Sequence, residues 1–140
     1  PVAGAAQPAA WQDPMTGYAI GGYDPLAYYT QGGPRPGNTA HELSWGGAVW
    51  RFTSSGNMAA FRLHPHVYAP RFAGYDPYML ASGRTAPGRP SIWVREGDSI
   101  FLFHNAANRH LWLEDKDAFL ELAERKWPEL ADGLPDSIGR

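Results

Sequence analysis

The chain has 140 residues, of which 44% are hydrophobic, and its formal net charge is −2. This length suits one domain, and 6 Trp, 7 Tyr and 6 Phe supply large side chains for a core. No basic surface is available for nucleic acid, no apolar run approaches the roughly 20 residues of a membrane span, and the lack of cysteine excludes disulfides and thiolate metal ligands.

The beginning of the chain is rich in Ala and Pro, which predicts a flexible tail over residues 1–14. Residue 1 is a proline, and we expect it to follow either the removal of an export signal or a shortening of the chain. Residues 15–128 are predicted to form one domain. Residues 129–140 have little pattern and predict a second tail.

Two stretches of the sequence resemble each other at an offset of about 51 residues. Val49–Phe52 corresponds to Ile100–Phe103, and Pro36–Gly37 corresponds to Pro87–Gly88. The shared order of such matches predicts an internal duplication, with one half over about 20–68 and the other over about 72–119. Chance similarity between two hairpin-plus-helix units is the alternative.

Each half begins with a corner in which aspartate precedes proline, Asp24–Pro25 in the first and Asp76–Pro77 in the second. An aspartate followed by proline is typical of a helix N-cap and first turn, so each corner predicts a short helix that ends near Gly32 or Gly83. A β-hairpin is then predicted in each half, 41–45 with 48–53 and 91–95 with 99–104.

Another helix is predicted after each hairpin, capped by Ser54 or Ser55 in the first half and by Asn105 in the second. Amphipathic spacing over 117–127 predicts a final helix that ends at Pro128. The sequence therefore predicts an α+β fold of two similar halves, each a short helix, a β-hairpin and a following helix, packed as one domain, plus a C-terminal helix.

The segment Gly22–Tyr23–Asp24–Pro25–Leu26–Ala27–Tyr28–Tyr29 resembles bacterial proteins of the YHS-domain family. Three further segments support the resemblance, which covers about residues 15–128: Trp50–Phe52, Asn57 with Ala60–Phe61, and Tyr68–Tyr75. The resemblance implies a small exported protein, periplasmic or secreted, that binds a heavy metal. Many relatives carry Cys where this chain has Asp76, and a carboxylate is a harder ligand than a thiolate.

The candidate site lies at the two corners. If the halves pack around a pseudo-twofold axis, Asp24 and Asp76 face one another and, with His104 at the end of a strand, form a site for a divalent metal such as copper or zinc. The alternative is that both carboxylates are helix caps. Tyr23, Tyr75 and Tyr78 gather at the same corners and are candidate ligand-binding residues, with core packing as their alternative.

Three functions are open on this interpretation. The first is an extracytoplasmic binding or accessory protein for a metal ion or a metal-loaded partner. The second is a protein–protein interaction module with an aromatic docking surface and no metal. The third is an enzyme that uses the paired carboxylates as acid and base, which requires one of them to be buried, uncapped and shifted in pKa.

Overall fold

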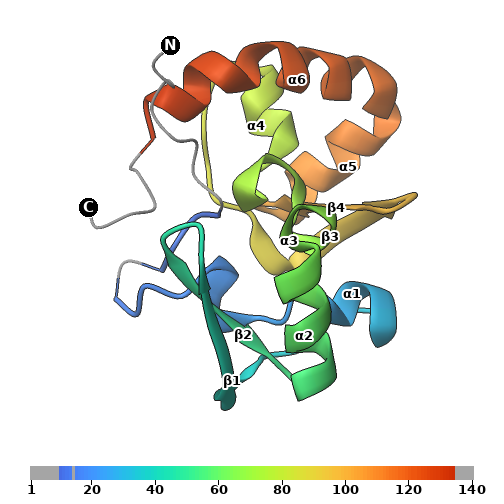
Figure 1. Ribbon diagram of the computed structural model, residues 1–140. Coiled ribbons are helices and arrows are strands. Elements are labelled where there is room, and N and C mark those ends of the chain that lie inside the picture. The colour runs from blue at the N-terminus through green and yellow to red at the C-terminus, as the bar shows by residue number, and fades with distance from the viewer. Residues whose placement is uncertain (1–9, 14, 135–140) are drawn as a thin grey trace.

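The computed structural model describes residues 10–13 and 15–134, and it confirms an α+β fold with two antiparallel hairpins, each followed by helices (Figure 1). In chain order the elements are the 3₁₀ turn η1 (Ile20–Gly22), α1 (Ala27–Thr30), β1 (Asn38–Trp45), β2 (Ala48–Phe52), α2 (Ser55–Leu63), α3 (Pro65–Tyr68), the 3₁₀ turn η2 (Arg71–Gly74), α4 (Pro77–Ala81), β3 (Arg89–Glu96), β4 (Ser99–Phe103), α5 (Ala106–Glu114) and α6 (Lys116–Asp132).

The packed part of the chain begins earlier than the predicted boundary at residue 15. Ala10 is buried, and the backbone N–H of Trp11 donates to the carbonyl of Ala73 at 2.9 Å. Residues 10–13 therefore belong to the domain, because they contribute both buried surface and a long-range hydrogen bond. Of the C-terminal tail predicted over 129–140, residues 129–132 belong to α6, whereas residues 1–9, 14 and 135–140 lie outside the described residues.

The last helix passes through Pro128, so the prediction that it ends there is wrong. A proline inside a helix costs about 3 kcal/mol, because it removes one hydrogen bond and crowds the preceding turn. Trp127 and Leu130 flank the proline and pack against a second hydrophobic cluster, which has Phe101, Phe103 and Trp112 at its centre. Ala131 is itself buried. Their burial offsets the cost and carries α6 on to Asp132.

The two halves make matching close contacts at corresponding glycines. Gly37 donates its N–H to the carbonyl of Gly22 at 2.9 Å, and Gly88 donates to Gly74 at 2.8 Å. A Cβ atom would lie 2.5 Å from Arg51 if built on Gly37, and 2.5 Å from Leu102 if built on Gly88. Both positions require glycine because the chain crosses directly over the second strand of the hairpin.

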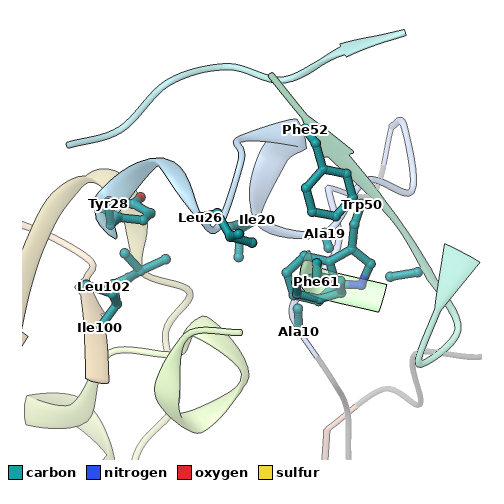
Figure 2. Packing of buried hydrophobic residues seen from close by; sticks show 11 residues of the cluster. Ala10, Ala19, Ile20, Leu26, Tyr28, Trp50, Phe52, Phe61, Ile100 and Leu102 are labelled. Atoms are coloured by element: carbon teal, nitrogen blue, oxygen red, sulfur yellow. The ribbon is translucent and has the colours of Figure 1, made fainter. Parts of the chain in front are cut away.

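Strand β4 belongs to both hydrophobic cores. Ile100 and Leu102 pack into the first cluster, whereas Phe101 and Phe103 pack into the second. Figure 2 shows Ile100 and Leu102 near Tyr28, at the opposite end of the first cluster from Trp50 and Phe61. Because side chains alternate along a strand, one face of β4 packs into the first cluster and the other face packs into the second, so this strand connects the two halves.

The two halves meet head to tail. Tyr28 and Tyr29 of the first half donate hydrogen bonds to the carbonyls of Pro90 (2.6 Å) and Asp98 (2.8 Å) in the second hairpin. The corresponding helix of the second half, α4, packs against α6 instead, with Lys126 Nζ donating to the carbonyl of Ala81 at 2.9 Å. Different faces of the two halves are therefore in contact, which differs from the pseudo-twofold packing under which Asp24 and Asp76 would face one another.

In the first hairpin, the face that corresponds to the Ile100 and Leu102 face of β4 is covered by the beginning of the chain. Glu42 and Arg51 lie opposite each other on this face and form an ion pair at 2.7 Å. The guanidinium of Arg51 also lies over the ring of Tyr18, 3.7 Å from its centroid. The N–H of Ala19 donates to the carbonyl of Val49 at 2.8 Å, so this segment adds a short stretch of backbone pairing to β2.

Candidate functional site

Asp24 lies in the first corner, and its side chain is fully buried. Its Oδ1 accepts from the backbone N–H of Leu26 at 2.8 Å. Its Oδ2 accepts three hydrogen bonds, from the N–H of Thr53 (2.7 Å), the hydroxyl of Thr53 (2.9 Å) and the amide of Asn57 (2.9 Å). The helix itself begins two residues later than predicted, at Ala27, so Asp24 shapes the turn before α1 and ties it to the end of β2 and to α2.

Asp76 repeats this arrangement in the second half and is also fully buried. Its Oδ1 accepts from the N–H groups of Tyr78 (2.8 Å) and Met79 (3.2 Å), which makes Asp76 the predicted N-cap of α4. Its Oδ2 accepts from the backbone N–H of His104 (2.8 Å) and the amide of Asn108 (2.9 Å). Each carboxylate therefore holds together a corner, the end of a strand and the following helix.

These hydrogen bonds occupy both oxygens of each carboxylate. Among the described residues, Asp24 and Asp76 share no hydrogen-bond partner, and each takes all its donors from its own half. The acid–base hypothesis required an uncapped carboxylate, and both carboxylates are occupied by backbone and amide donors. Their geometry supports the structural role that the sequence also allowed.

His104 lies next to Asp76 through its backbone rather than through its imidazole. The ring Nδ1 is 3.0 Å from the carbonyl of Pro87, so this nitrogen donates the hydrogen bond. Within the described part of the chain, no three His, Asp or Glu side chains are grouped so that they could hold a metal ion. Metal binding by Asp24, Asp76 and His104 stays a prediction, and it would have to displace the hydrogen bonds of both carboxylates.

The three candidate tyrosines are divided between the cores. Tyr23 packs against the first cluster, and Tyr75 and Tyr78 pack against the second. The ring of Tyr75 lies 6.2 Å from Trp127, and burial raises the pKa of its hydroxyl. The ring of Tyr78 meets Phe119 edge to face at 5.2 Å. The core-packing alternative thus describes their contacts, and ligand binding by them stays a prediction.

The junction of α2 and α3 carries a surface that sequence reasoning missed. Leu63 is 74% exposed and Val67 is 55% exposed, although both are large apolar side chains. Arg62, His64 and His66 are exposed beside them. We call these five residues the basic corner.

The duplication supplies the signal by which the basic corner could have been found. At the offset of 51 residues, Leu63 corresponds to Glu114 and Val67 corresponds to Ala118. The backbone is alike at both places, with φ −139° and ψ 62° at His64 and φ −154° and ψ 59° at Asp115. The same kink therefore forms with a carboxylate and a methyl group, so the fold does not require the two apolar side chains.

The junction of α5 and α6 has the opposite charge. Glu114, Asp115 and Asp117 are exposed there, and Leu111 and Leu113 next to them are 38% and 48% exposed. We call these five residues the acidic corner. Each half of the molecule thus carries a helix–helix junction with exposed apolar side chains, one junction basic and the other acidic.

Comparison with known proteins finds no match for this chain among family models, curated proteins or solved structures. In residues 10–13 and 15–134, no helix has both the length and the apolar character needed to cross a membrane. The observations that bear on function are therefore the surroundings of Asp24 and Asp76 and the exposed residues of the basic corner and the acidic corner.

Proposed function

We propose that this chain is an interaction module that docks a partner polypeptide through the basic corner. The observation that carries the proposal is the exposure of Leu63 and Val67, 74% and 55%, on neighbouring turns of the chain. Burying an exposed Leu or Val side chain contributes about 1.5–3 kcal/mol, which is a strong incentive for association. Such paired apolar exposure with a charged rim is typical of a docking surface.

The comparison between the halves argues against an incidental exposure. Glu114 and Ala118 occupy the matching positions, and the second half folds with the same kink. Because folding makes no demand for Leu63 and Val67, we attribute them to binding. The resemblance of residues 22–29 to the YHS-domain family adds the expectation that docking occurs in the periplasm or outside the cell.

Photo-crosslinking tests this proposal directly. A benzophenone amino acid placed at Val67 should form discrete adducts with another polypeptide in the cells that make this protein. The matched control is the same amino acid at Thr39, an exposed residue of β1. Adducts should appear from position 67, be weak or lacking from position 39, and disappear when Leu63→Glu is added to the position-67 variant.

Two results would contradict the proposal. The first is that position 67 yields no discrete adduct although the protein accumulates to the same level as the control. The second is an adduct that persists unchanged with Leu63→Glu, since that charge in an apolar contact should prevent docking. Both variants change exposed side chains, so their thermal unfolding should match that of the parent protein.

A further inference from the structure

The charge of the basic corner is not neutralised within the fold. None of the ion pairs in the described part of the chain involves Arg62. The ring of His66 lies against the ring of Trp45, with 5.0 Å between their centroids, and in residues 10–13 and 15–134 no ion pair involves His66. An occupant of this corner must therefore bring negative charge together with apolar side chains.

The acidic corner has that chemistry. Of the basic residues near it in the chain, Lys116 is paired with Glu96 at 2.7 Å, and Arg109 donates to the carbonyl of Trp93 at 3.5 Å. Among the described residues, the one ion pair of Glu114 is with the exposed His110, at 3.6 Å. Leu111 and Leu113 add exposed apolar surface beside these carboxylates. The acidic corner is thus a match for the basic corner in both charge and apolar character.

We propose that the partner seated on the basic corner is the acidic corner of a second copy of this chain. This inference rests on the proposed function, and it names the partner. The α2–α3 junction and the α5–α6 junction occupy separate places in the fold, so the corners of one copy cannot meet each other (Figure 1). The contact joins two different surfaces, and each copy keeps one unused corner for a further copy.

Sedimentation equilibrium of the full chain with charge-reversed variants tests this arrangement. Arg62→Glu removes a working basic corner and leaves the acidic corner intact, whereas Glu114→Arg does the reverse. The parent protein should gain mass as its concentration rises from about 10 µM to about 1 mM, the range of weak interfaces. Each variant alone should associate at least about tenfold more weakly, because like charges now face one another.

The decisive sample is an equimolar mixture of the two variants. Its components together contain one intact basic corner and one intact acidic corner, and the reversed charges at positions 62 and 114 are also opposite in sign, so the mixture should regain the association that each variant alone has lost. High salt, about 500 mM, should weaken the association of the parent protein. Circular dichroism should show unchanged folding, since Arg62 and Glu114 are both exposed.

The possible failures separate this inference from the proposed function. A parent protein that stays monomeric up to about 1 mM overturns the inference, and so does a mixture no heavier than its components. If the protein is monomeric and position 67 still forms an adduct with a different polypeptide, docking at the basic corner stands and the second copy is excluded. If neither association nor an adduct is found, both proposals fail.

Discussion

At the scale of single residues, the sequence predicted half of what the two buried aspartates do. An aspartate before a proline indicates a cap, and one oxygen of each carboxylate does accept from nearby backbone N–H groups. The other oxygen reaches 29 residues ahead to Thr53 in the first half and 28 residues ahead to His104 in the second. Local pattern carries no information about such distant donors, so that role was not predictable.

Replacing either aspartate by asparagine should be strongly destabilising. An amide nitrogen at the position of Oδ2 cannot accept the hydrogen bonds that converge there, and the buried donors lose a charged acceptor. We expect Asp24→Asn and Asp76→Asn each to lower the free energy of unfolding by about 2–4 kcal/mol. Urea unfolding followed by circular dichroism measures this as a lower midpoint at constant slope.

The control for these variants is Asp132→Asn, an exposed aspartate in the last turn of α6. Its free energy of unfolding should stay within about 0.5 kcal/mol of the parent value. A loss below about 1 kcal/mol for both buried aspartates would contradict their role in holding the corner, the strand end and the following helix together. Each carboxylate accepts four hydrogen bonds, so its replacement should cost more than that.

At the scale of elements, the two 3₁₀ turns before Asp24 and Asp76 have a backbone conformation that the sequence indicates in only one of them. In η1 the φ values of Ile20, Gly21 and Gly22 are 43°, 67° and 84°, so three consecutive residues are left-handed. The turn η2 repeats this with Phe72 (57°), Ala73 (56°) and Gly74 (81°). Paired glycines indicate the first turn, but nothing in Phe–Ala indicates the second, because buried packing rather than local preference holds it there.

Exchanging the middle residues of these turns should have opposite effects in the two halves. A left-handed conformation costs a residue with a Cβ about 1–2 kcal/mol. Ala73→Gly should therefore raise the free energy of unfolding by up to about 1 kcal/mol, after the added freedom of the unfolded chain is subtracted. Gly21→Ala should lower it by about 1 kcal/mol, since a Cβ there meets Trp11 only at 3.7 Å and no clash adds to the strain.

Urea unfolding of both variants checks this prediction, with Ala81→Gly as the control. Ala81 lies in α4, where glycine should destabilise the protein by about 1 kcal/mol. A loss at Ala73→Gly as large as that at Ala81→Gly would show that the methyl group of Ala73 contributes more through packing than it costs through strain.

At the scale of the whole molecule, the repeat was predictable and its packing was not. An offset shows that two units are alike, but it does not show which faces meet. The informative difference lies in the strands: Val49–Trp50–Arg51–Phe52 contains a charged residue, as expected for a strand with one face toward solvent, whereas Ile100–Phe101–Leu102–Phe103 is apolar throughout. The continuous run belongs to β4, which is buried on both sides between the cores.

This sharing of β4 predicts that the first half cannot fold alone. A fragment ending at Tyr68 lacks Ile100 and Leu102 from its own core and the carbonyls that accept from Tyr28 and Tyr29. We expect residues 1–68 to show no near-ultraviolet circular dichroism and no cooperative urea transition. An equimolar mixture with residues 69–140 should regain both, because the second fragment supplies the missing strand. A cooperative transition of the first fragment by itself would contradict this prediction and would mean that the halves fold independently. The contact between the halves would then form after each half has folded, and neither half would need it in order to fold.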